Sequence, residues 1–244
     1  MINFIYNIPT RLGLPTIPIN IGTAKPKTNS YISNPILDNV FTKNQIINIV
    51  NKNSRIKELL SRHNIQLEVN LNVLEEIKQK HLKNTYLIAT KIYMSLPEEL
   101  KNKVNLEDLQ NASILHDYGK ILIPEKILNK KGKFNEDERK VMELHSELGY
   151  ELLKNENLSQ KTLNLIKYHH QNINKKGYPS VDNSFNFGLE HQILSLADKY
   201  SALREKRSYK NPLAKYEALE IIAKEVNNGN VSQEVYTALL KSVA

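Results

Sequence analysis

Apolar residues recur at spacings of three and four along most of this 244-residue chain. The period is clear from about residue 37 and returns in each later segment, including two final stretches at about 213–227 and 231–243. This spacing places apolar side chains on one face of a helix, whereas a half-buried strand requires alternation. Strand patterns are nearly absent. The sequence therefore predicts an all-α fold, long enough for one sizeable core with a small extra segment.

The first 36 residues depart from this pattern, because they contain five prolines and show no sustained period. They are expected to form an irregular arm, which either lies on the body of the protein through its apolar residues or is disordered. A helical stretch follows at about 37–62. We therefore expect residues 1–70 to form an arm with an accessory helix and residues 71–244 to form the main domain.

Composition limits the chemistry that is open to the chain. It has no cysteine, which excludes disulfides, zinc–thiolate sites and thiol nucleophiles, so nitrogen and oxygen must hold any metal. No window approaches the roughly 18 apolar residues of a membrane span, and the N-terminus is a poor signal peptide. We expect a soluble, cytoplasmic protein with no membrane partner.

The formal net charge is +8. Scattered lysines favour a solvated surface, with attraction of an anionic substrate as the alternative. There is no compact basic run with interleaved aromatic residues, so no nucleic acid polymer is expected as a partner.

Polar residues that cap helix N-termini precede several of the helical segments. They are Asn70 or Asn72, before a helix to about Ser95, then Asn105, Asn135 and Ser159. Asn135 and Glu138 have the spacing of a capping box. Gly119 is expected to end the helix that follows Asn105, Pro124 to begin the next element, and a further helix to begin near Leu189.

Seven ionisable residues lie on or beside the apolar faces of five successive predicted helices. They are His81, His116, Asp117, His145, His169, His170 and Asp198. Burying a carboxylate or several imidazoles without partners costs several kcal/mol, and convergence on cations would offset that cost. The remaining histidines are interpreted differently: His63 as a surface residue and His191 as a residue that binds no metal.

A set of histidines and aspartates suits iron, manganese or zinc better than calcium or magnesium. Seven ligands are too many for one metal with an open position. Two metals that share Asp117 would each have about four ligands, and such pairs, about 3.5–4 Å apart, activate water for displacement at phosphorus.

The order and spacing of these residues resemble an HD-GYP domain, a branch of the HD metal-dependent phosphohydrolases, over roughly residues 72–241. The matching pieces are His81, His116-Asp117-Tyr118-Gly119-Lys120, Ile123-Pro124 with Ile127-Leu128-Asn129-Lys130, His145 within Glu143–Gly149, His169-His170, Gly177-Tyr178-Pro179, Leu196-Ala197-Asp198 through Ala202-Leu203, and Arg207-Ser208-Tyr209-Lys210.

The resemblance implies an HD-domain helical bundle and a phosphodiesterase that hydrolyses cyclic di-GMP, first to the linear dinucleotide and in some members to GMP. Metal-activated hydroxide would attack phosphorus. Two divalent metals are implied, with iron or manganese favoured and zinc as an alternative. His81, His116, Asp117 and Asp198 would hold one metal, and Asp117, His145, His169 and His170 the other. Lys120 would contact a phosphate oxygen and offset transition-state charge, so Asp117 and Lys120 are the expected catalytic residues. Lys120, Tyr178, Arg207 and Lys210 would bind the dinucleotide.

Several positions depart from the family pattern without removing a predicted metal ligand. A glutamate that some members carry four residues before the first histidine, where it helps to bind a third metal, is Ile77 here, which predicts two metals. The other departures are Gln171, Asn174, Lys175, Ser201 and Arg204. They bear on substrate choice and turnover. Two alternatives stay open: an HD-type phosphohydrolase of another nucleotide or cyclic dinucleotide, and a weakly active cyclic-dinucleotide sensor or adaptor. A homodimer or a signalling partner also stays open.

Overall fold

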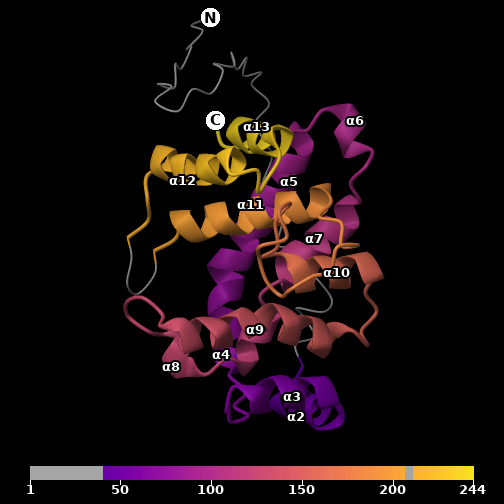
Figure 1. Ribbon diagram of the computed structural model, residues 1–244, viewed down its shortest axis with the longest axis vertical. Coiled ribbons are helices and arrows are strands. Elements are labelled where there is room, and N and C mark those ends of the chain that lie inside the picture. Colours follow the sequence, from indigo (N-terminus) through magenta and orange to yellow (C-terminus); the bar gives the residue numbers. More distant parts are fainter. Residues whose placement is uncertain (1–40, 207–210) are drawn as a thin grey trace, which may run out of the picture. The chain divides into compact units, whose positions relative to one another are not determined.

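The computed structural model describes residues 41–206 and 211–244, which lie in the compact unit Ser33–Ala244. Within the described ranges every regular element is a helix (Figure 1). The predicted all-α fold is therefore confirmed. The arm predicted for residues 1–36 lies outside the described residues, as do Arg207 and Lys210. In the described part of the chain, no helix combines the length and the apolar character needed to cross a bilayer.

The helical stretch expected at 37–62 is divided into α2 (Lys43–Lys52) and α3 (Ser54–Arg62). Asn53 causes the break: its backbone is extended, and its side chain accepts a hydrogen bond from the backbone N–H of Ile56 as the N-cap of α3. The same side chain donates to Glu151 Oε2 at 2.8 Å, on helix α9 (Glu136–Leu153). The accessory helices thus contact the helix that carries His145. The division of the chain at residue 70 stays a prediction.

The next helix runs from α4 (Leu71–Ile77) through a π-helical turn (Lys78–Leu82) into α5 (Lys83–Ser95). Of the two candidate caps, Asn70 begins α4, because its side chain accepts from the backbone N–H of Asn72 at 3.1 Å. The π-helical turn contains His81, which is 5% exposed. Such turns widen a helix locally and are frequent at functional sites.

The prediction that Gly119 ends a helix is wrong. Helix α7 (Leu106–Leu115) begins after the predicted cap Asn105 and ends four residues earlier, and Gly119 lies inside the 3₁₀ helix η2 (Tyr118–Leu122). A β-carbon on Gly119 would lie 2.0 Å from the carbonyl oxygen of His145 and 2.4 Å from the amide nitrogen of Gly149. The glycine therefore serves the close packing of η2 on α9.

The other predicted helix starts are confirmed. Asn135 and Glu138 form the capping box of α9, Ser159 caps α10 (Gln160–Tyr168), and α11 (Leu189–Arg204) begins at Leu189. Pro124 precedes the short helix α8 (Glu125–Leu128). The final helices are α12 (Lys215–Asn227) and α13 (Gln233–Ser242), and a short helix α6 (Glu98–Lys101) was not predicted.

Packing around α5 and α7 brings the histidine-bearing segments together. Helix α5 packs against α7, α11 and α13, while α10 packs against both α7 and α9 (Figure 1). Fully buried leucines and isoleucines fill these contacts, among them Leu82, Ile92, Leu109 and Leu194. The ligand candidates lie on the sides of these helices that face one another.

Candidate metal centre

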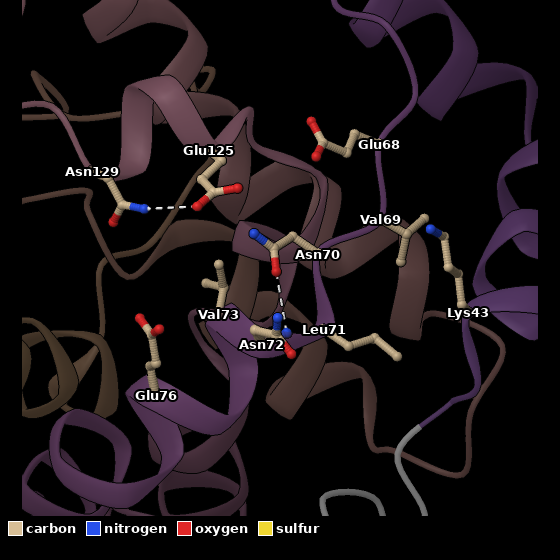
Figure 2. Close-up of a pocket in the computed structure, with 10 residues that line it drawn as sticks. All are labelled: Lys43, Glu68, Val69, Asn70, Leu71, Asn72, Val73, Glu76, Glu125 and Asn129. Carbon is tan, nitrogen blue, oxygen red and sulfur yellow. Dashed lines mark hydrogen bonds between the residues drawn. The ribbon is translucent and has the colours of Figure 1, made fainter.

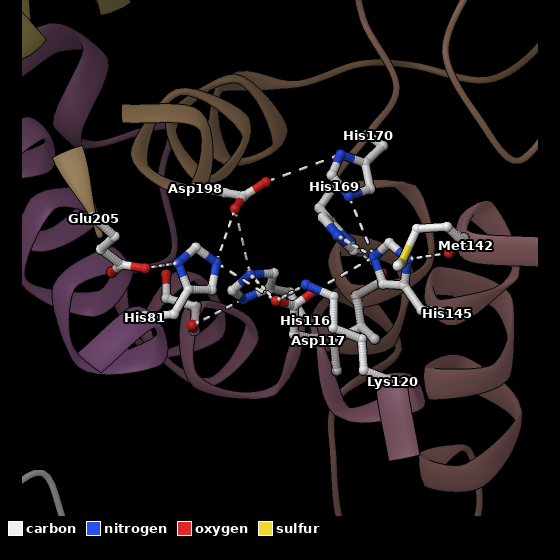
Figure 3. Close-up of polar contacts among 12 residues, drawn as sticks. His81, His116, Asp117, Lys120, Met142, His145, His169, His170, Asp198 and Glu205 are labelled. Atoms are coloured by element: carbon white, nitrogen blue, oxygen red, sulfur yellow. Dashed lines mark hydrogen bonds and ion pairs between the residues drawn. The ribbon is translucent and has the colours of Figure 1, made fainter. Parts of the chain in front are cut away.

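All seven ionisable residues predicted to converge do so (Figure 3). Three groups have ligand atoms within 4.8 Å of one another: His145 with His169 and His170, His81 with His116 and Asp117, and His116 with His169 and Asp198. The π-helical turn supplies one of these residues, the junction of α7 and η2 supplies two, and α9, the end of α10 and α11 supply the others. Shared members join the three groups into one cluster.

Three of these histidines are anchored in the same way through Nδ1. Each Nδ1 faces the backbone carbonyl of the residue three positions earlier, an acceptor that fixes the proton on Nδ1. The pairs are His116 with Ser113 at 3.0 Å, His145 with Met142 at 2.7 Å, and His169 with Ile166 at 2.7 Å. Their Nε2 lone pairs therefore remain available to the centre of the cluster.

The contacts between Nε2 atoms are those expected of residues that share a cation. His145 Nε2 lies 3.2 Å from His169 Nε2 and 3.2 Å from His170 Nε2. With both Nδ1 protons committed to carbonyls, His145 and His169 direct two lone pairs at each other and cannot form a hydrogen bond. His116 Nε2 is buried and has no hydrogen-bond partner within the described ranges. Nitrogen atoms in this arrangement fit a divalent transition metal.

Asp117 lies between the two ends of the cluster. Its Oδ1 is 3.4 Å from His145 Nε2, whereas its Oδ2 is 3.4 Å from His81 Nε2 and 3.6 Å from His116 Nε2. At the latter end, Asp198 Oδ1 lies 3.0 Å from His81 Nε2 and 3.7 Å from His116 Nε2. One carboxylate thus presents a different oxygen to each end.

Electrostatics differ between the two ends. Burial lowers the pKa of His145 to about 4 and that of His170 to about 3, and it holds the pKa of His169 well below its ordinary value. These imidazoles are neutral near pH 7, the state in which they can bind a metal.

His81 behaves in the opposite way. Burial opposes its protonation, but the carboxylates of Asp198, Glu205 and Asp117 outweigh burial and raise its pKa to about 9. Burial also opposes ionisation of Asp117, yet Lys120 and the neighbouring histidines hold the pKa of that carboxyl well below its ordinary value. Without a metal, His81 is therefore protonated near pH 7. A metal that binds at the end of the cluster formed by His81, His116 and Asp198 must displace this proton.

Lys120 is paired with the central carboxylate, because its Nζ donates to Asp117 Oδ2 at 2.6 Å. Its side chain is 19% exposed, so the ammonium group borders the cluster from a partly open position. The Tyr178 ring also borders the cluster, with its centroid 4.5 Å from that of His170 and 6.2 Å from that of His145.

The two remaining histidines lie outside the cluster. His191 Nε2 contacts Asn164 Oδ1 at 2.8 Å, and the His191 ring packs against Phe185 and Phe187. His63 is the C-terminal cap of α3. That these two residues bind no metal stays a prediction.

Sequence reasoning missed Glu205. Its Oε2 lies 3.2 Å from His81 Nδ1, and its Oε1 accepts from Asn84 Nδ2 at 3.0 Å. Glu205 is the C-terminal cap of α11 and has an extended backbone, so helical periodicity gave no signal that its side chain meets His81.

A surface cavity of about 410 Å³ involves none of the seven cluster residues (Figure 2). Its lining includes Glu68, Glu76 and Glu125 together with Asn72 and Asn129. It contains no histidine and is a hollow separate from the metal centre.

Comparisons with known proteins agree with this arrangement. A family model described as HD domain matches residues 48–235. A 3'3'-cGAMP-specific phosphodiesterase 2 of Vibrio cholerae is 38% identical over 106 residues, which cover 43% of this chain and 20% of that protein. A cyclic di-GMP phosphodiesterase of Thermotoga maritima is 32% identical over 142 residues, or 57% of this chain and 38% of that protein. The match thus spans well under half the length of these curated relatives.

A solved structure of an HDG"Y"P protein from Bdellovibrio bacteriovorus superposes with a TM-score of 0.50 and 14% identity. The superposition covers 83% of this chain and 57% of that one. At this identity the likeness concerns the fold.

Proposed function

This chain belongs to the HD domain family, and we propose that it is a metal-dependent phosphodiesterase that hydrolyses a cyclic dinucleotide. The observation that carries the proposal is the pair of facing lone pairs on His145 and His169, 3.2 Å apart, beside a buried carboxylate that reaches both ends of the cluster. The names of the curated relatives support the substrate class.

We assign one divalent metal to each end of the cluster. His81, His116, Asp117 and Asp198 would hold the first metal, and Asp117, His145, His169 and His170 would hold the second. Iron or manganese is favoured, with zinc as the alternative, because the donors are imidazoles and carboxylates. When bound, the two metals supply Lewis acidity at phosphorus and activate water as the nucleophile.

The chain's own residues bind the substrate and compensate its charge. Lys120 donates to the central carboxylate of Asp117, and we assign its ammonium group to a non-bridging phosphate oxygen of the substrate, where it would offset charge that grows in the transition state. Tyr178 borders the site and is assigned to the dinucleotide, together with Arg207 and Lys210, which lie outside the described residues. Cyclic di-GMP is the proposed substrate, while the relatives' names also include 3'3'-cGAMP.

Turnover assays of the metal-loaded chain test this function. The protein is reconstituted anaerobically with Fe²⁺ or Mn²⁺ and incubated with cyclic di-GMP, 3'3'-cGAMP, cyclic di-AMP and simple nucleotides, and the products are resolved by chromatography. We expect a linear dinucleotide from cyclic di-GMP, and none from an Asp117→Ala control. Turnover of mononucleotides alone would show that the chain is a phosphohydrolase of other nucleotides and not of cyclic dinucleotides. Binding of a cyclic dinucleotide without turnover would indicate a sensor.

A further inference from the structure

His170 differs from the other four histidines of the cluster, because no hydrogen-bond acceptor holds its Nδ1 in the described part of the chain. The nearest carboxylate oxygen, Asp198 Oδ2, is 3.9 Å away. Its side chain is also 26% exposed, whereas that of His145 is 2% exposed. A hydrogen bond to the second ring nitrogen normally orients a metal-binding imidazole. His170 must be oriented by another contact.

The rings of His169 and Tyr178 lie against His170, the former with the centroids 4.0 Å apart. His169 is itself a candidate metal ligand, so Tyr178 is the contact that comes from outside the ligand set. The ring centroids of Tyr178 and His170 are 4.5 Å apart and the ring planes are inclined by 33°, a tilted face contact. An aromatic contact of this kind contributes about 0.5–1.5 kcal/mol beyond the area that it buries. Tyr178 therefore restrains the rotation of the one imidazole that lacks a hydrogen-bonded anchor.

Gln171 holds Tyr178 in this position. Its amide oxygen accepts from the backbone N–H of Gly177 at 3.1 Å, and its amide nitrogen donates to the carbonyl of Pro179 at 2.7 Å. These bonds lie on either side of Tyr178, and Gln171 is 1% exposed. At this position one side-chain atom must accept from Gly177 and a second must donate to Pro179. An amide side chain can do both, whereas an ionised carboxylate can only accept.

The turn also lies directly on the backbone of His170. A β-carbon on Gly177 would lie 2.0 Å from the carbonyl oxygen of His170 and 2.7 Å from the α-carbon of Gln171. Gly177 thus permits the turn to approach the backbone of His170, and the hydrogen bonds of Gln171 hold the turn there. The Tyr178 ring is thereby placed against the His170 imidazole.

We propose that Tyr178, held by Gln171, is a positioning residue that orients His170 for metal binding. This inference rests on the proposed metal centre and not on the identity of the substrate. It differs from a role of Tyr178 in binding the dinucleotide, which would leave metal affinity unchanged whether the ring or the hydroxyl contacts the substrate. Orientation of His170 depends on the ring and not on the hydroxyl.

Metal titration of the apoprotein separates these roles. Mn²⁺ or Zn²⁺ is titrated by calorimetry into wild type, Tyr178→Phe, Tyr178→Leu and Gln171→Glu. We expect Tyr178→Leu to weaken one of the two metal sites about tenfold or more, while Tyr178→Phe retains both affinities. Gln171→Glu should weaken the same site, because a carboxylate cannot donate to Pro179. Wild-type affinities in Tyr178→Leu, or equal losses in Tyr178→Phe and Tyr178→Leu, would overturn the proposal.

The second metal site is the internal control, since a general loss of structure would weaken both sites. The ¹⁵N spectrum of His170 in the Zn²⁺-loaded proteins gives an independent readout: a wild-type signal in Tyr178→Phe and an altered one in Tyr178→Leu are expected. No substrate enters these measurements. If the chain hydrolyses no cyclic dinucleotide, the titration still decides the role of Tyr178, and if the wild type binds no metal, the proposed metal centre itself fails.

Discussion

Gly119 and His145 are in backbone contact, so close that a β-carbon on the glycine would lie 2.0 Å from the histidine's carbonyl oxygen. The contact joins η2 to α9, and two residues before Gly119 the Asp117 carboxylate reaches His145 Nε2 at 3.4 Å. The geometry of the cluster thus depends on two backbones that meet without an intervening side chain.

Replacing Gly119 by alanine is expected to destabilise the protein by about 3 kcal/mol or more, since the atoms that a methyl group would meet belong to the backbone and cannot rotate away. Gly149→Ala is the matched control. Its β-carbon would lie 3.2 Å from the amide nitrogen of Gly119, and alanine favours the helix interior, so we expect a change of about 1 kcal/mol or less. Urea denaturation of the apoproteins measures both. Equal midpoints for Gly119→Ala and the wild type would contradict the packing argument.

Asp117→Ala is expected to remove both metals, because this carboxylate contacts both ends of the cluster. His81→Ala should remove only the metal of its own end. Elemental analysis of the purified proteins gives the metal content per chain. A full complement in Asp117→Ala would refute the bridging assignment, as would identical losses in the two variants.

Glu205→Ala should weaken metal binding at the His81 end about tenfold, because the carboxylate accepts from Nδ1 and so directs Nε2 toward the metal. Glu205→Gln keeps an oxygen acceptor and should lose less. Titration of Zn²⁺ into each apoprotein measures the effect, with the His145 end as an unchanged reference. A Glu205→Ala protein with two wild-type affinities would show that the contact has no role in orientation.

Stability of the apoprotein should fall as the pH is lowered from about 6.5 toward 4, partly through His191. Burial lowers the pKa of His191 to about 4, whereas an unfolded histidine has a pKa of about 6.5. Between these values the unfolded chain binds more protons, so acid favours unfolding, by at most about 3 kcal/mol from this residue.

The variant His191→Gln can still donate to Asn164 but does not titrate. Its free energy of unfolding should therefore fall less steeply than that of the wild type between pH 7 and 5, as measured by urea denaturation. The buried histidines of the cluster titrate in both proteins, so only the difference between the slopes reports on His191. Parallel slopes would show that His191 has the same pKa in the folded and unfolded states, and would contradict the prediction.

Features that depend on residues close together in the sequence could be predicted from the sequence. Asn135 and Glu138 predicted their capping box correctly, since a cap depends on residues three positions apart. His81, His116 and Asp198 could be placed on apolar helix faces by the same local periodicity, and the number of buried ionisable groups indicated that they meet. Gly119 was misjudged for the same reason: a rule for helix ends describes one segment, whereas this glycine serves a contact with another.

The sequence by itself determined the helical class, most helix boundaries and the set of side chains that converge, because period, capping and the cost of burying charge follow from residue type and spacing. Only the tertiary structure decided how the ring nitrogens are held. Glu205 meets His81 across 124 residues, and Gln171 fixes the turn that places Tyr178 on His170. Such contacts arise where packed helices and their connecting turns meet, and the pattern of a single segment carries no record of the partner it will meet.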